Sequence, residues 1–96
     1  MKIVYRPHLE IRLKERKFPE DYPKKIVQEP EHRYVDKLTK HIIAIKQLHY
    51  AEKLRYIAVA YDIIDSVIEV ITIHPVDEAE MRNKVRTGRW KLYAKN

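Results

Sequence analysis

Basic side chains recur at helical spacing in two parts of the chain. They are His8, Arg12 and Arg16 near the start, and Arg82, Arg86 and Arg89, followed by Trp90, near the end. Residues three or four positions apart share one side of a helix, so each set would form a strip of positive charge beside an imidazole or an indole. A guanidinium matches the oxygens of a phosphate group and stays charged at any working pH. Both strips therefore predict binding of nucleic acid.

Two histidines are candidates for proton transfer in RNA cleavage. Cleavage without a metal needs a base for the 2′-OH, an acid for the leaving 5′-oxygen and positive charge at the phosphorus. His8 opens an expected helix and His74 closes an expected strand, so the two can form a catalytic pair if these elements are adjacent. The structural alternatives are an exposed helix residue for His8 and a backbone hydrogen bond before Pro75 for His74.

The arginines of the first strip also have a structural interpretation. Glu15 and Glu20 lie near enough in the sequence to form surface ion pairs with Arg12 and Arg16. Long arginine stems commonly cover the edge of an apolar core. For Arg12 we weigh phosphate binding and these structural roles equally, and we interpret Arg16 in a similar way.

The second strip has a similar alternative. Arg82, Arg86 and Arg89 can form the solvated face of a helix, where a basic side chain near the C-terminus complements the helix dipole. Trp90 can stack on a base, but core packing is the stronger expectation for a lone tryptophan in a small protein.

Length and composition narrow the class of protein. The 96 residues suit a single domain, 1–96, with one modest core. The 20 Lys and Arg against 14 Asp and Glu give a net charge of +6, which favours a polyanionic partner such as RNA. The chain contains no cysteine, which excludes disulfides, thiolate zinc sites and a thiol nucleophile.

Neither a metal nor another cofactor is expected. His41 and His49 share strand parity, but no third ligand stands at a fitting spacing. No apolar run approaches the roughly 20 residues that cross a bilayer, and residues 1–6 lack the apolar stretch of a signal peptide. We therefore expect a cytoplasmic protein with no membrane partner.

The first third of the chain predicts one strand and two helices. Residues 2–6 favour a short strand, which ends at Pro7 because proline cannot donate to the ladder. Pro7 suits the first turn of a helix whose Leu9 and Leu13 face the core. The sequence Pro-Glu-Asp at 19–21 opens a second helix, which Pro30 prevents from continuing.

After His32 the pattern changes to that of strands. Residues 40–50, 54–61 and 66–74 are rich in Ile, Val, Thr and Tyr and predict three antiparallel strands, and residues 33–36 predict a short edge strand. The two connections between the three strands contain no glycine. We therefore expect loops built on type I turns there, more readily than tight two-residue hairpins.

The last helix has the clearest local signature. Asp77 is its expected N-cap, with Glu80 three residues on, and Gly88, the only glycine, is its expected end. The order of elements predicts a two-layer α+β domain with a mainly antiparallel sheet, the N-terminal helices on one face and a short C-terminal helix.

This order of elements resembles the RelE/ParE toxin-like superfamily, within the broader group that holds barnase-like and colicin-type ribonucleases. The pattern His8-x-x-x-Arg12-x-x-x-Arg16, followed by the Pro-Glu-Asp opening and the stop at Pro30, is similar to an uncharacterised RelE-related family. Members of that family begin with His, Arg and Arg at this spacing.

The chain departs from that family at two places. The family usually has Gly-Ile where this sequence has Lys17-Phe18, and a small residue where it has Leu9. The resemblance implies a metal-independent RNase fold, in which basic residues hold phosphate and side chains on helix and sheet perform acid–base chemistry. Relatives in the superfamily also include toxins that act on gyrase and domains without demonstrated catalysis.

Three functions follow as hypotheses. The first is a RelE-like toxin that cuts RNA, free or on the ribosome, by attack of the 2′-OH on the phosphate. The second is a non-catalytic module that binds RNA or DNA. The third is a protein-interaction domain whose basic strips meet an acidic partner such as an antitoxin segment, with an open sheet edge near residues 33–36 to admit a partner strand.

Overall fold

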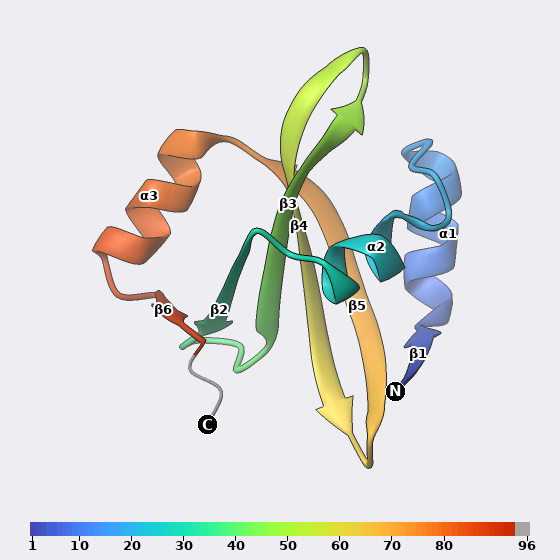
Figure 1. The fold of residues 1–96 in the computed structure, drawn as a ribbon, viewed down its shortest axis with the longest axis horizontal. Coiled ribbons are helices and arrows are strands. Elements are labelled where there is room, and N and C mark those ends of the chain that lie inside the picture. The colour runs from blue at the N-terminus through green and yellow to red at the C-terminus, as the bar shows by residue number, and fades with distance from the viewer. Residues whose placement is uncertain (94–96) are drawn as a thin grey trace.

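A six-stranded sheet forms the centre of the protein in the computed structural model, which describes residues 1–93 (Figure 1). In chain order the elements are β1 (Lys2–Tyr5), α1 (Pro7–Glu15), α2 (Tyr22–Gln28), β2 (His32–Asp36), β3 (Ile42–Tyr50), β4 (Lys53–Ile64), β5 (Val67–Val76), α3 (Glu78–Arg86) and β6 (Trp90–Leu92). The strands lie in the order β1-β5-β4-β3-β2-β6, with β1 parallel to β5 and the other neighbours antiparallel. The predicted α+β class with a mainly antiparallel sheet is confirmed.

Local signals in the sequence set the start of α1 and both ends of α3 as expected, whereas α2 begins at Tyr22, after the Pro-Glu-Asp sequence that was expected to open it. Pro7 occupies the first turn of α1, and Leu9 and Leu13 are buried against the sheet. The Asp77 carboxylate accepts a hydrogen bond from the Glu80 amide at 2.7 Å and so caps α3. Gly88 lies just beyond α3 with φ of +81°, a left-handed conformation that suits glycine.

The helices do not share one face of the sheet, which differs from the expected two-layer arrangement. Helices α1 and α2 pack on a cluster that includes Ala44, Ile57 and Val59, whereas Met81 of α3 packs on the opposite face. The residues of that second face are Ile43, Ile45, Ala58, Ala60 and Val76. The reason is that β3 and β4 carry apolar residues at consecutive positions, so both faces of the sheet centre need cover.

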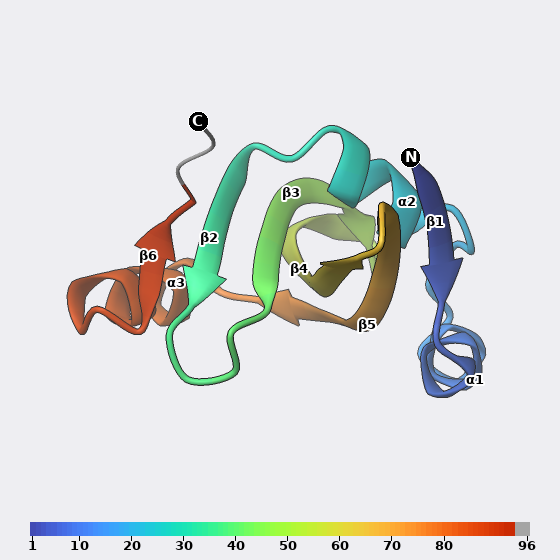
Figure 2. The same cartoon turned by 90° about the horizontal axis from the view of Figure 1, so that it is seen from below.

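Seen from below, the strongly twisted sheet separates the helices along its width (Figure 2). Helix α1 lies beside β1 and β5 at one side, and α3 lies beside β6 at the other. One groove of the surface lies next to α1 and another lies next to α3.

Strand β2 is not a free edge, which corrects the expectation for residues 33–36. It pairs with β3 on one side and with β6 on the other, through Tyr34 and Leu92, Val35 and Lys91, and Asp36 and Trp90. Residues 89–93 turn back along β2 and cover it, so in the described part of the chain the outer strands are β1 and β6. A partner strand therefore cannot pair with β2 as proposed from the sequence.

Both long hairpins close with two-residue turns, so the expectation of type I loops was wrong. The turn residues have positive φ: 51° and 68° at Ala51 and Glu52, and 49° and 63° at Asp65 and Ser66. Two successive positive φ values define a type I′ turn, whose twist matches that of the flanking strands. The long paired ladder of β3 and β4 imposes this geometry on residues that do not favour it.

Relief of this turn strain should stabilise the protein. We expect Glu52→Gly to raise the free energy of unfolding by about 1 kcal/mol, because glycine adopts positive φ without a steric penalty. Chemical denaturation measures the change. Lys53→Gly, one residue further into β4, is the control and should lower the free energy of unfolding. A lower stability of Glu52→Gly would contradict the strained turn.

Candidate functional site

Four of the predicted site residues line one groove between α1 and β5. The groove has a volume of about 440 Å³ and is lined by His8, Leu9, Arg12, Arg16, Ile71, Thr72, Ile73 and His74. The two histidines and two arginines come from segments nearly sixty residues apart in the chain. Helix α1 therefore lies next to the end of β5 that carries His74, as expected.

The groove exists because β1 is shorter than β5. Strand β1 pairs only with residues 67–70 of β5, and the amide of Arg6 makes a further hydrogen bond to the Val70 carbonyl at 3.2 Å. Pro7 then starts α1, which lies along the remaining edge of β5. The Arg16 guanidinium donates to the Ile73 carbonyl at 3.1 Å, which satisfies a backbone acceptor at this edge.

Arg12 holds the ring of His8 within the groove. Its Nε donates a hydrogen bond to Nε2 of His8 at 3.0 Å. An accepting Nε2 requires the neutral ring with the proton on Nδ1. Neither Glu15 nor Glu20 takes part in this contact, so Arg12 makes a contact different from the surface ion pairs considered from the sequence. Arg12 and His8 both line the groove, so the guanidinium places positive charge beside this imidazole.

His74 carries the clearest electrostatic perturbation in the groove. It lies opposite Ala58 of β4 and is half-buried. Burial lowers the pKa of His74 below 6.5; the charges of Lys84 and Arg16 lower it further, whereas Glu80 opposes them. The imidazole is therefore neutral at pH 7 and has a free lone pair to accept a proton.

Arg82 and Arg86 lie in a different place. They line a second groove of about 800 Å³, between α3 and the sheet, which we call the α3 groove. Arg82 lies 3.4 Å from the Glu78 carboxylate, and Arg86 donates to Asn83 Oδ1 at 2.8 Å. Arg82 and Arg86 therefore lie in a groove separate from the one that His8, Arg12 and Arg16 line.

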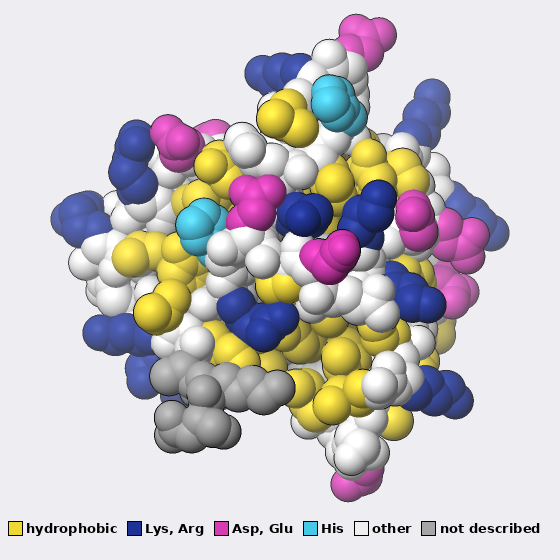
Figure 3. Space-filling view, in the orientation of Figure 1, with side chains coloured by type: hydrophobic (Ala, Val, Ile, Leu, Met, Phe, Trp, Pro, Cys, Tyr) yellow, Lys and Arg dark blue, Asp and Glu magenta, His cyan; other side chains and the backbone are white. Residues whose placement is uncertain are grey.

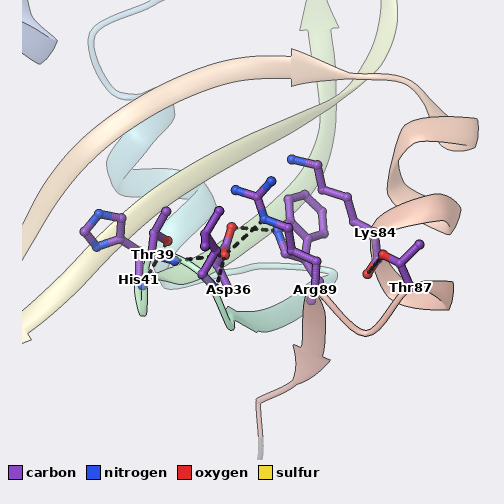
Figure 4. Close-up of polar contacts among 8 residues, drawn as sticks. Asp36, Thr39, His41, Lys84, Thr87 and Arg89 are labelled. Atoms are coloured by element: carbon purple, nitrogen blue, oxygen red, sulfur yellow. Dashed lines mark hydrogen bonds and ion pairs between the residues drawn. The ribbon is translucent and has the colours of Figure 1, made fainter.

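Arg89 belongs to neither groove. Its Nε donates to Asp36 Oδ1 at 3.3 Å, and the indole of Trp90 donates to Asp36 Oδ2 at 3.2 Å. Figure 4 shows the Asp36 carboxylate between Arg89 on one side and Thr39 on the other. Trp90 is 2 % exposed, in agreement with the expected core packing. Arg89 therefore acts as the partner of a buried carboxylate.

The Asp36 carboxylate is buried yet charged. Burial alone raises its pKa, but hydrogen bonds from the Thr39 and Leu38 amides, Arg89 and Trp90 outweigh burial and lower the pKa from 3.8 to about 2. These contacts join β2, the following turn and β6. They therefore fix β6 against β2.

Thr72 and His32 were missed at the level of sequence. Thr72 joins the α1–β5 groove, and His32 lines the α3 groove beside Tyr34 and Tyr56. Strand parity places Tyr34 and Tyr56 on the face that α3 covers once the registers of β2 against β3 and of β3 against β4 are known. An unforeseen contact joins Nδ1 of His41, just before β3, and Oδ1 of Asp62 in β4 at 2.8 Å.

Charge is widely distributed over the rest of the surface. On the face in Figure 3, Lys and Arg side chains lie at the upper, left and right margins, and Asp and Glu side chains lie among them. Within residues 1–93, no three His, Asp or Glu side chains are arranged to ligate a metal ion. The same residues include no helix with the length and apolar character to cross a membrane.

Comparison with known proteins finds no family model that matches the chain, and no curated protein or solved structure with significant similarity to it. The geometry of the grooves is therefore the basis for a functional argument.

The titration of His74 provides a direct check on the groove. We expect its pKa to lie below 6.5 and to rise when Arg16→Met removes a neighbouring positive charge. Nitrogen–proton NMR of the imidazoles over a pH series measures both values. Lys14→Met, which removes an exposed charge from the same helix, should leave the pKa of His74 unchanged. A wild-type value above 6.5 would contradict the buried, cation-flanked environment.

Acid stability tests the Asp36 network. Because the folded-state pKa is depressed, the stabilisation is present above pH 3.8 and is lost as the pH falls toward about 2. The shift corresponds to about 2 kcal/mol of unfolding free energy. Denaturant titrations across this window should show the loss in the wild type and a flatter profile in Asp36→Asn. Equal pH dependence in both proteins would assign the acid sensitivity to other carboxylates.

Proposed function

We propose that the protein is a metal-independent endoribonuclease that binds and cleaves RNA in the groove between α1 and β5. The observation that supports the proposal is the meeting of His8, Arg12, Arg16 and His74 around one small volume. Two imidazoles and two guanidiniums are the groups that attack by a 2′-OH on a phosphate requires. The depressed pKa of His74 favours its role as the base.

In the proposed reaction, His74 accepts the proton of the 2′-OH. The 2′-oxygen forms a bond to phosphorus, and the bond from phosphorus to the 5′-oxygen breaks with its electron pair on that oxygen. A protonated His8 gives its proton to the 5′-oxygen, so the products are a 2′,3′-cyclic phosphate and a 5′-OH. Arg12 and Arg16 neutralise the charge that develops on the phosphoryl oxygens.

The contact between Arg12 and His8 suggests how the acid forms. In the free protein the Arg12 guanidinium donates a hydrogen bond to Nε2 of His8. A bound phosphate competes for this guanidinium because an Arg–phosphate pair is a charge-assisted hydrogen bond. Nε2 is then released, can bind a proton, and lies beside the phosphate that needs it.

The proposal includes a relationship of this protein to RelE-like toxins. The order strand, two helices, antiparallel strands and final helix supports it, as does the His-x-x-x-Arg-x-x-x-Arg pattern on α1. Under this proposal the natural substrate is RNA, free or in the ribosome, and an acidic antitoxin-like protein is the expected regulator. A non-catalytic RNA- or DNA-binding module is the alternative that the experiment below distinguishes.

Cleavage of a defined RNA in the presence of chelator tests the proposal. We expect a 2′,3′-cyclic phosphate product, and a loss of about 100-fold in rate for His8→Gln and for His74→Gln with RNA affinity retained. Arg12→Ala should weaken RNA binding by about 1 to 3 kcal/mol. Mass spectrometry of the products and a filter-binding assay provide the two measurements.

The control is His49→Gln, which changes an exposed histidine outside the groove and should keep the wild-type rate. The pH dependence of the rate should have its acidic limb below 6.5, where His74 becomes protonated. If wild-type protein free of contaminating nuclease cuts neither free RNA nor programmed ribosomes, the catalytic proposal is wrong. Salt-sensitive RNA binding in that case would support the binding module.

A further inference from the structure

The α3 groove combines aromatic rings with positive charge. Its floor and walls include His32, Tyr34, Tyr56 and Met81, and its rim carries Arg82 and Arg86. We propose that this groove binds a single unpaired nucleotide, with the base against the aromatic rings and the phosphate at the arginines. The inference depends on the proposed function only for RNA as the source of that nucleotide.

The rings are fixed before any ligand binds. Tyr34 stacks on the buried Trp90 with centroids 5.7 Å apart and an angle of 23° between the planes. His32 stacks on Tyr34 at 6.2 Å and 22°. The Lys84 ammonium lies 5.0 Å from the centre of the Trp90 ring, and Asp36 holds the indole NH. Tyr34 therefore rests on a rigid base.

These rings also have surface left for a ligand. His32 is exposed, and Tyr34 and Tyr56 are half-buried, although all three line the groove. A row of nearly parallel rings accepts another flat ring more readily than it accepts an aliphatic side chain. Stacking on aromatic side chains tolerates any base, so we expect little preference among the four nucleotides.

The charges at the rim fit the phosphate of such a nucleotide. A guanidinium has five N–H donors, and the contacts of Arg82 to Glu78 and of Arg86 to Asn83 use one donor each. Glu78 is the single acidic residue that lines the groove, against two arginines. The combination of ring and cation distinguishes a nucleotide from an apolar peptide, which would need no phosphate contact.

Binding of 5′-AMP, followed by the fluorescence of Trp90, tests the inference, because Trp90 is the only tryptophan and stacks beneath Tyr34. We expect Tyr56→Leu to weaken binding about tenfold and Tyr56→Phe, which keeps the ring, to bind as the wild type does. Arg86→Gln should also weaken AMP binding about tenfold but leave the affinity for adenosine unchanged. His32→Ala, at an exposed position, provides a second aromatic variant if Tyr56→Leu does not fold.

Arg12→Ala separates this inference from the proposed function, because Arg12 lies in the other groove. It should bind AMP as the wild type does. Loss of AMP binding in Arg12→Ala with retention in Tyr56→Leu and His32→Ala would place the nucleotide in the α1–β5 groove and overturn the inference. No AMP binding by an active ribonuclease would also overturn it while the proposed function stands.

Discussion

The free edge of β5 is the constraint on which the candidate site depends. Strand β1 cannot continue beside β5 after Pro7, because proline has no amide hydrogen to donate to the ladder. The remaining backbone acceptors of β5 need other partners, and Arg16 supplies one of them through the Ile73 carbonyl. This requirement brings α1 alongside β5, so His8 and Arg12 face the segment that carries His74. Arg16 therefore both satisfies a backbone acceptor of β5 and lines the groove proposed for RNA cleavage.

At the other side of the sheet, the contacts of Asp36 likewise position the residues of a groove. The charged Asp36 is stable in the interior only because four donors surround it, two of them from the last segment of the chain. Arg89 and Trp90 are thereby bound to β2, and Trp90 in turn supports Tyr34. The contacts of Asp36 thus hold β6 against β2 and also position the aromatic rings that line the α3 groove.

Local chemistry explains which parts of this fold the sequence predicts. The prolines before α1 and after α2, the Asp77 cap and Gly88 act within a few residues, and each element they define is present. Three other features depend on contacts across the whole sheet and were not predicted. They are the type I′ turns at Ala51 and Asp65, the side of the sheet that α3 covers, and the pairing of β6 with β2. For the site, spacing on α1 predicted the shared face of His8, Arg12 and Arg16. Two further features could be predicted only with the strand register. They are the separation of Arg82 and Arg86 from that face and the contact of Arg89 with Asp36.

The proposed function requires that the side chains of the α1–β5 groove surround one RNA phosphate. Imidazole NMR during titration with a 2′-O-methyl RNA, which cannot be cleaved because it lacks the attacking hydroxyl, tests this arrangement. We expect the NMR signals of the ring nitrogens of His8 and His74 to shift together, and Nε2 of His8 to lose its contact with Arg12 as phosphate binds. Binding of the RNA without any change at His8 and His74 would contradict this arrangement.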